Sequence, residues 1–587
     1  MFGGLAAAFM MATSVQAGQA LAGQAPAGQA EYAPKMIAYS AYPNPYFNER
    51  ARDVARIYDG FFFVIGSWDE GVIANLGIGR EEAPTTDWKE RVRENLAHLR
   101  QAGVTENLIG IHFAESAPWP SPETLLSKEY TAKLARHFSA IGKAAKELGF
   151  RGVSIDVEYP YPRYSLDHKI YTYSGYTADD LLAAASGQGR AVMSALLSEF
   201  PEAVVFVLPG EIWSRPIARA FMVSMLHVMA EKDAPGGFHL GYERAYCLYE
   251  PVSQVAIPRV GDCMASVLLD GKELDYWRRR CTVAPGVWPL HMVETGGKDY
   301  PVRPWAEELA ELGQQMAILR SVAKRYIWSF SGQPVWYVHS AEIERKYGLP
   351  KQAFKGAREV IAGWQEILSE RKRVTDPGIK RLIRAVKDFD QGKINCAELC
   401  SRFGTPGDWL VLGPLGNPFT HPEHSAPGAI FRPVRLDEAI NGRDGVVHWF
   451  PFHNYEPTGS VRLMAAFDWR STDDCSADLV CTVSARKPVR GYMWINWDDG
   501  IEVWLNGRTV FEHRTYPKQG HGLLHRDRYL FEERVPVVIP KGESRLAVTC
   551  INSHGLWGFN MRFTDKDGFP LEGATFSVPP CASQAPY

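Results

Sequence analysis

The sequence predicts an α/β fold in its first part, a (β/α)8 or TIM barrel, followed by an all-β jelly-roll sandwich. From residue 35 to about 375, short apolar runs alternate with helix-like segments about eight times, as in a barrel of parallel strands and crossover helices. Composition changes at residues 404–418. Beyond them helical periodicity is weak, and alternating strand patterns are separated by Gly, Asn and Asp turns, which is typical of an antiparallel sandwich.

The barrel strands are predicted from short runs of β-formers, with amphipathic segments between them. In segment 88–103, Val92, Leu96 and Leu99 share one helical face, and segment 127–149 ends at a glycine, as helices often do. A doubly wound open sheet fits the alternation too, but no glycine-rich phosphate loop follows the first strand. The predicted strands are 36–42, 61–67, 108–114, 152–158, 203–209, 237–243, 286–294 and 326–332.

Four parts are expected along the chain: a signal peptide and spacer (1–34), the catalytic barrel (35–375), a helical linker (376–405) and the sandwich (406–587). The first part contains the apolar stretch LAAAFMMATSV, the small-x-small tripeptide VQA (15–17) and three AGQA repeats. Such a leader indicates export, so we expect a secreted or periplasmic protein. No later run approaches the ~20 apolar residues that a membrane span needs.

Composition argues against some partners and favours others. The 587 residues carry a formal net charge of −3 without a long basic run, so we expect neither nucleic acid nor an anionic membrane surface as partner. Trp, Tyr and Phe make up 12% of the chain, which suits a neutral, partly apolar ligand such as a carbohydrate. No GxSxG, HExxH or Walker pattern occurs, and we expect no cofactor. The sequence makes no prediction of oligomeric state.

The nine cysteines are odd in number. None forms a CxxC or Cys/His zinc pattern, so we expect no metal site. In an exported protein some cysteines pair. The nearest candidates along the chain are Cys263–Cys281 and Cys475–Cys481.

Acidic and aromatic residues stand at the carboxyl ends of the predicted strands. All strands of a barrel end at one common mouth, so we expect these residues to meet there. Carboxylates transfer protons and stabilise positive charge on a sugar ring, and indole faces stack on pyranosides. The pattern therefore predicts a carbohydrate site. Its expected members are Trp68, Asp69, Glu70, His112, Glu115, Asp156, Glu158, Glu211, Trp213, Tyr242, Glu243, His291, Glu294, Trp328, Gln333 and Trp336.

The stretch GVSIDVEYPYP (152–162) resembles the fourth-strand signature of glycoside hydrolase family 18, the chitinase family. That signature runs Asp-Gly-x-Asp-x-Asp-x-Glu and is commonly followed by Tyr-Pro. Arg151 and Ser154 replace its first two acidic residues. The residues that match in register are Gly152, Asp156, Glu158, Tyr159 and Pro160.

Two further positions carry the same resemblance, which covers only the barrel half. Residues 240–243, LGYE, are similar to the family's Met-x-Tyr-Asp on strand six, and Trp328 stands where its strand-eight tryptophan floors the subsite. The family's Ser-x-Gly-Gly of strand three is missing from LIGIHFAES. The resemblance supports the barrel architecture better than it supports chitin as the substrate.

The acidic pair supplies a mechanism. Residues two apart in a strand point to one side, about 6.6–7 Å apart, so Asp156 and Glu158 are expected to project inward together. Two neighbouring carboxylates resist ionising together, which favours Glu158 as the general acid on the leaving oxygen. As the resemblance implies, Asp156 would orient a 2-acetamido group of the substrate that serves as nucleophile.

Two alternatives stay open. In the first, Glu158 is the acid/base and Glu294, at the tip of strand seven, is the nucleophile, a placement used by the large clan of retaining β-glycosidases. That clan has Asn-Glu at the acid/base, where this chain has Val157 before the Glu. In the second, the chain is a non-catalytic carbohydrate-binding protein on a degenerate barrel, for which Arg151 and Ser154 are the main argument.

The stretch WINWDDGIEVWLNGRTVFEH (494–513) closely resembles the galactose-binding-like jelly rolls appended to many secreted carbohydrate enzymes. In such domains the Asp-Asp-Gly forms a tight turn and Asn506-Gly507 a hairpin turn. From the residues alone we expect two hairpins on a sandwich, with Trp504 in the core rather than on a ligand platform.

Overall fold

A computed structural model describes residues 33–579 with gaps. The stretches outside the description are 64–86, 113–121, 158–174, 211–214, 292–303, 338–339, 350–355, 422–427, 468–472 and 515–530, together with residues 247, 249, 333, 371, 532 and 556.

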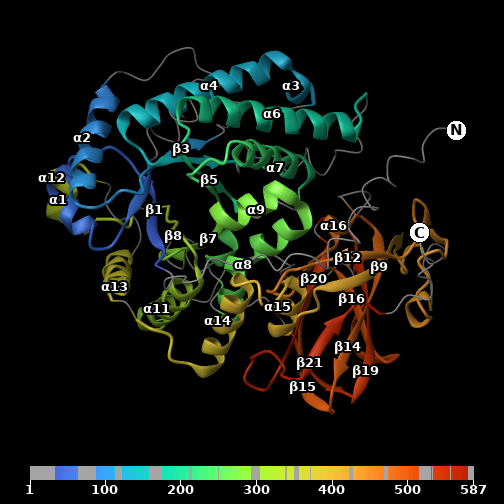
Figure 1. Ribbon diagram of the computed structural model, residues 1–587. Helices are drawn as coiled ribbons and strands as arrows, with labels where there is room; N and C mark the ends of the chain where they lie inside the picture. Colours follow the sequence, from blue (N-terminus) through green and yellow to red (C-terminus); the bar gives the residue numbers. More distant parts are fainter. Residues whose placement is uncertain are drawn as a thin grey trace.

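Eight parallel strands close into a barrel in the order β1 to β8, surrounded by helices (Figure 1). The last strand closes the barrel on the first, with Ile37 opposite Trp328. The fold class is therefore the predicted TIM barrel. Its strands are β1 Lys35–Ala41, β2 Gly60–Phe63, β3 Leu108–His112, β4 Gly152–Asp156, β5 Val204–Leu208, β6 Phe238–Tyr242, β7 Thr282–Val287 and β8 Tyr326–Ser329.

Strand β7 differs from its prediction. The structure places it at Thr282–Val287, whereas the sequence favoured 286–294. Each of the two runs contains a proline, Pro285 in TVAPGV and Pro289 in GVWPLHMVE, which lacks the N–H that a strand interior normally donates. The residues therefore do not decide between them, and the longer apolar run was the one favoured. The residues predicted for the tip of this strand, His291 and Glu294, consequently follow the strand instead of ending it.

The helices fill the crossovers that the amphipathic segments predicted. Val92, Leu96 and Leu99 are fully buried on helix α2, and α4 ends at Gly149 with φ +85°. The helices are α1 Pro45–Val54, α2 Asp87–Gln101, α3 Pro122–Leu126, α4 Lys128–Leu148, α6 Ala178–Glu199, α7 Pro216–Glu231, η2 Glu243–Ala245, α8 Pro251–Leu268, α9 Gly271–Arg280, α11 Trp305–Val322, α12 Ala341–Tyr347, α13 Ala357–Ser369, α14 Pro377–Asp390, α15 Cys396–Arg402, η4 Ala429–Phe431 and α16 Leu463–Ala466.

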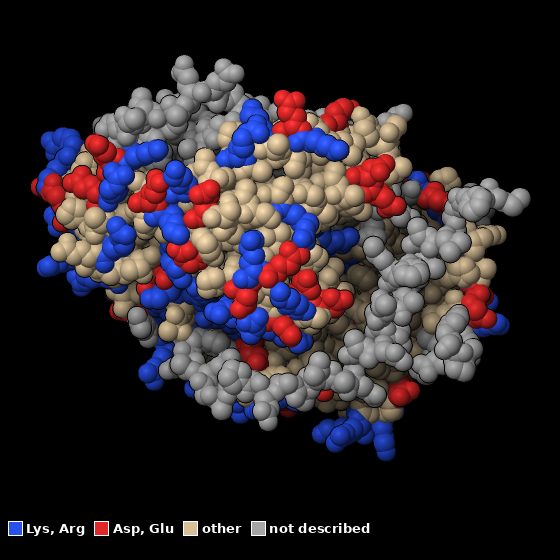
Figure 2. All heavy atoms as spheres, turned by 45° about the horizontal axis from the view of Figure 1, so that its top comes forward, with Lys and Arg blue, Asp and Glu red and all other residues tan. Residues whose placement is uncertain are grey.

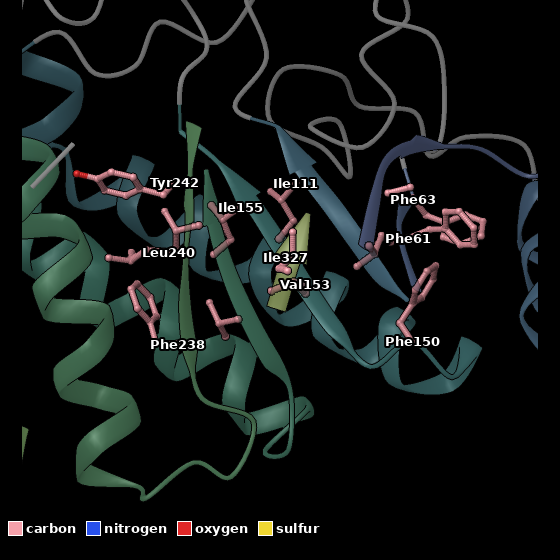
Figure 3. Packing of buried hydrophobic residues seen from close by; sticks show 14 of the residues in the cluster. Phe61, Phe63, Ile111, Phe150, Val153, Ile155, Phe238, Leu240, Tyr242 and Ile327 are labelled. Atoms are coloured by element: carbon pink, nitrogen blue, oxygen red, sulfur yellow. The ribbon is translucent and has the colours of Figure 1, made fainter. Parts of the chain in front are cut away.

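Alternation along each strand divides the barrel's side chains into two layers. One apolar cluster fills the interior and includes Phe62, Phe206 and Trp328. A second lies between the strands and the helices and includes Ile155 and Leu240 (Figure 3). Within each strand, therefore, every second residue faces the barrel axis and the residues between them face the helices.

The C-terminal part is an antiparallel sandwich, as predicted. One sheet has the order β12-β9-β14-β19-β16-β17, with β21 beside β14, and the other the order β13-β20-β15-β18. Its strands, with the small hairpin β10–β11, are β9 Asp408–Gly416, β10 Ile440–Gly442, β11 Gly445–Val447, β12 Phe450–His453, β13 Ser460–Arg462, β14 Cys475–Ala485, β15 Val489–Trp497, β16 Gly500–Leu505, β17 Arg508–His513, β18 Glu533–Ile539, β19 Gly542–Asn552, β20 Gly558–Thr564 and β21 Ala574–Ser577.

One of the two expected hairpins is present. Asn506 and Gly507 both have positive φ and join β16 to β17, as a two-residue hairpin turn requires. The Asp-Asp-Gly stretch does not make a second hairpin, because β15 and β16 belong to different sheets. It carries the chain from one layer of the sandwich to the other.

The predicted disulfides are wrong. All seven cysteines that the structure describes are free and buried. Cys475 and Cys481 lie in one strand, six residues or about 20 Å apart, far beyond the ~7 Å that a disulfide spans between Cα atoms. The Cys263 thiol instead hydrogen-bonds the Cys396 thiol of α15.

None of the described helices is long and apolar enough to cross a membrane. On the face that carries α4 and α6, basic and acidic side chains of the described residues are interspersed (Figure 2).

Buried charges join the sandwich to the barrel, which it meets beside α8, α14 and α15 (Figure 1). Arg562 of β20 is 0% exposed and donates to Glu250 Oε2 at 2.7 Å and Ser253 Oγ at 2.8 Å. Glu250 also caps α8 by accepting from the backbone N–H groups of Val252 and Ser253. One carboxylate thus serves both the start of a barrel helix and the sandwich.

Arg562→Met should lower the free energy of unfolding by about 3–5 kcal/mol, because it leaves Glu250 as a buried charge without its partner. Urea unfolding followed by fluorescence measures the change. Arg381→Met is the control. Its ion pair with Glu572 also joins the two domains but is largely exposed, so its loss should cost less than about 1 kcal/mol. Equal effects of the two variants would contradict the assignment of Arg562 as the partner of a buried Glu250 carboxylate.

His239 gives a pH prediction. It is fully buried inside the barrel against Phe206 and Tyr326, and burial, with a smaller effect of Arg325, lowers its pKa to about 3. Below pH 6.5 the His239 side chain is protonated in the unfolded chain, whereas in the folded chain it stays neutral down to about pH 3. The stability contributed by neutral His239 is therefore present above pH 6.5 and lost as the pH falls toward 3.

Between pH 7 and 4.5, wild type should lose about 2–3 kcal/mol more than His239→Gln. Urea unfolding at a series of pH values measures this difference. Parallel pH profiles for the two proteins would show that His239 is not kept neutral by burial.

Candidate active site

Asp156 ends strand β4 and faces the barrel interior. Its Oδ2 accepts a hydrogen bond of 3.4 Å from the Tyr39 hydroxyl, and Tyr39 lies on β1, across the barrel. Both side chains are 6% exposed. The next backbone N–H, of Val157, donates to Leu208 O at 2.7 Å, which extends the ladder between β4 and β5 past the strand end. Asp156 is thus held at the carboxyl end of the barrel, beneath the mouth.

Three partly exposed rings lie beside this pair: Tyr246, Trp288 and Phe330, which we call the aromatic platform. Tyr246 stacks on Phe330 with centroids 5.4 Å apart, and Trp288 meets Phe330 edge-on at 5.1 Å. Phe330 also lies 5.5 Å from the Tyr39 ring. The platform therefore adjoins the Tyr39–Asp156 pair, and its three residues are partly exposed.

Gly286 on β7 makes room for the platform. A Cβ at this position would lie 2.5 Å from the Tyr246 ring and 3.0 Å from the Trp328 ring. Because real Cβ contacts do not come so close, the bare Cα of Gly286 leaves the space that the Tyr246 ring occupies.

Trp328, Tyr242 and Trp336 were predicted to line the site, and all three are buried. Trp328, 1% exposed, is in the barrel interior and donates from Nε1 to Ala284 O at 3.1 Å, so it supports the platform from below. Tyr242 lies with Leu240 on the helix side of β6 (Figure 3). Trp336, also 1% exposed, stacks on Phe47 of α1 at 4.5 Å. None of the three offers a free ring face at the mouth.

His291 and Glu243 remain near the mouth. His291 is buried and packs edge-on against Trp288 at 4.7 Å, so it supports the aromatic platform from one side. Glu243 directly follows β6, is half-buried and begins η2. His112 lies on β3 opposite Asp156 in the strand register.

The remaining predicted site residues lie outside the described residues. Their assignments stay predictions. They are Trp68, Asp69, Glu70, Glu115, Glu158, Glu211, Trp213, Glu294 and Gln333.

Sequence reasoning missed the residues that do form the described mouth: Tyr39, Tyr246, Trp288 and Phe330. A signal for two of them was present. Inward positions repeat every second residue. Phe330, directly after β8, therefore continues the inner side of Trp328, and Trp288, directly after β7, continues that of Gly286. Using this alternation requires strand ends correct to one residue, which the sequence of β7 did not provide.

Chemically, the described site joins a carboxylate, a phenol hydroxyl and apolar ring faces. Such a set can hydrogen-bond a hydroxyl-rich ligand and stack against its apolar side. Within the described part of the chain, no group of three or more His, Cys, Asp or Glu side chains is arranged to hold a metal ion.

Comparison with known proteins gives only remote likenesses. No protein-family model and no curated protein matches the sequence. Similar solved structures include a GH18 chitinase from Pseudoalteromonas aurantia, 12% identical, with 50% of this chain and 94% of that chain covered and a TM-score of 0.28.

Two other structures are equally distant. Xylanase10C from Cellvibrio japonicus is 11% identical, with 58% of this chain and 71% of that chain covered and a TM-score of 0.33. Old Yellow Enzyme from Pichia sp. AKU4542 is 12% identical, with 55% and 85% covered and a TM-score of 0.30. Likenesses this weak carry no argument about the reaction, which has to come from the site itself.

Gly286→Ala should cost about 1–3 kcal/mol of unfolding free energy, because its methyl group overlaps the Tyr246 ring. In the Tyr246→Ala background the same change should cost at least 1 kcal/mol less. Urea unfolding of the four proteins of this double-mutant cycle measures the difference. Gly187→Ala on α6, with open space at its Cβ, is the control and should not destabilise. If the losses of unfolding free energy from Gly286→Ala and Tyr246→Ala simply add, the contact between these two residues is refuted.

Proposed function

We propose that the protein is a glycoside hydrolase that binds a neutral oligosaccharide at the carboxyl end of the barrel. The observation that carries this proposal is the aromatic platform beside the inward-facing Asp156. Ring faces stack on the apolar side of a pyranose while a carboxylate accepts from its hydroxyl groups. Catalytic groups of barrel enzymes lie at this end of the strands.

In the proposed reaction Glu158 is the general acid. It follows Asp156 by two residues and gives its proton to the glycosidic oxygen as the bond to the leaving sugar breaks. The resemblance of 152–160 to the chitinase signature supports a substrate whose own 2-acetamido oxygen attacks the anomeric carbon. Asp156, oriented by Tyr39, would then hold the acetamido N–H and stabilise the positive charge that develops on that group.

The two alternatives are not equally supported. The observed end of β7 at Val287 removes the strand-tip argument for Glu294 as nucleophile. The non-catalytic reading has an observation in its favour, because Ser154 occupies the buried inward position below Asp156 where the chitinase signature has an acid. We also propose export, on the leader sequence alone, and a galactose-binding-like origin for the sandwich, on residues 494–513.

Release of reducing ends from N-acetylchitohexaose, xylohexaose and cellohexaose tests the proposal. Wild type should cleave the N-acetylated probe, and Glu158→Gln should lower kcat about 10²–10⁴-fold, the usual contribution of a general acid. Trp288→Ala should raise KM, since the platform binds substrate. Glu147→Gln, an exposed glutamate on α4, is the charge-matched control and should behave as wild type.

Three other outcomes would contradict parts of the proposed function. Probe binding without release of reducing ends, unchanged in Glu158→Gln, would favour the non-catalytic reading. A covalent adduct of a 2-fluoroglycoside on Glu294 would replace substrate assistance by a two-carboxylate mechanism. Failure of all three probes to bind would refute the proposed substrate class.

A further inference from the structure

The sandwich reaches the barrel close to the candidate active site. Strand β6 ends at Tyr242, and residues 243–246, which comprise η2 and Tyr246, follow directly. We call these four residues the β6 turn. It begins with Glu243 at the mouth and ends with Tyr246 of the aromatic platform, and Arg244 lies between them.

Arg244 is bound by the sandwich. It is 7% exposed; its Nη2 donates to Ser460 Oγ at 2.5 Å and its Nη1 lies 3.5 Å from Glu456 Oε1. The Ser460 hydroxyl in turn hydrogen-bonds Asn560 of the neighbouring strand β20, and Glu456 accepts from Thr458 Oγ1 at 2.7 Å. The acceptors of Arg244 are therefore buried and held in place by their own partners.

The same turn is held from the barrel side. Gln315 of α11 donates from Nε2 to Ala245 O at 2.8 Å, and the Tyr246 N–H donates to Glu243 O at 2.8 Å. Tyr246 then packs over Gly286 and against Phe330. A short chain of contacts thus runs from the sandwich through Arg244 to the partly exposed Tyr246 of the aromatic platform.

We propose that Arg244 is a positioning residue through which the sandwich fixes Tyr246, so that Glu456 and Ser460 of the second domain control ligand affinity at the barrel mouth. A turn of four residues without this anchor would sample several conformations, and ligand binding would have to order it each time. Holding the ring in place beforehand removes that cost and favours binding. The inference rests on the proposed function only for the identity of the ligand.

Two variants test the anchor from its two ends, Arg244→Met and Ser460→Ala. Arg381→Met is the control, since it breaks an ion pair between α14 and Glu572 of the sandwich that does not involve the β6 turn. Hydrogen exchange of peptides covering 243–246 needs no ligand. Exchange of these peptides should be at least tenfold faster in Arg244→Met and faster to a smaller extent in Ser460→Ala. Exchange in strands β3 to β5, and exchange of the 243–246 peptides in Arg381→Met, should be unchanged.

Affinity for N-acetylchitohexaose is the second readout. Arg244→Met should raise its Kd and KM about tenfold, or 1.4 kcal/mol, and leave kcat within about twofold, because the residue acts on binding through Tyr246. Arg244→Lys should recover part of the loss, since one ammonium group can reach one of the two acceptors but lacks the guanidinium fork.

The exchange and affinity measurements separate the two proposals. Faster exchange of 243–246 with no binding of the probe to wild type would support the anchor and refute only the proposed ligand. Unchanged exchange in Arg244→Met, or an equal effect of Arg381→Met, would overturn the anchor whatever the ligand is. A tenfold loss of kcat with constant KM would also overturn it, because Arg244 would then act on the chemical step.

Discussion

The two-residue repeat of the β-strand is the constraint on which this molecule's site depends. In a closed parallel barrel each strand has one side toward the axis and one toward the helices. Because of this alternation, Tyr39 and Asp156 meet across the barrel interior, and Tyr242 lies on the helix side. A shift of one residue in any strand would exchange the two sets, so the mouth is defined by strand register before any individual contact forms.

Closure of the barrel explains why the mouth is aromatic. The interior contains large buried rings, among them Trp328, and Trp328 contacts Tyr246 of the platform at 5.3 Å between ring centroids. The same hydrophobic burial that stabilises the barrel therefore also supports a surface able to stack on a sugar. Gly286 lies between the barrel interior and the platform. Because it has no side chain, the Tyr246 ring can occupy the space next to it.

The second domain is joined to the barrel by buried charges as well as by the helical linker. Arg562 and Arg244 both bury a guanidinium between the domains, each paired with one carboxylate, Glu250 or Glu456. A buried pair of this kind adds little net stability over apolar residues of the same volume, but removal of one partner leaves a buried charge uncompensated. Since one pair caps α8 and the other holds the turn after β6, the orientation of the sandwich and the shape of the mouth depend on each other.

The sequence alone determined the class of fold, seven of the eight barrel strands and the direction of Asp156, because these follow from local periodicity. It also indicated the sandwich and its Asn506-Gly507 turn, which depend on backbone preferences of single residues. Only the tertiary structure decided where β7 begins, which of the described tryptophans are buried, and that the seven described cysteines are unpaired. It alone showed that Arg244 reaches Ser460 across 216 residues of chain, since long-range contacts arise from the packing of whole elements and leave no periodic trace in the sequence.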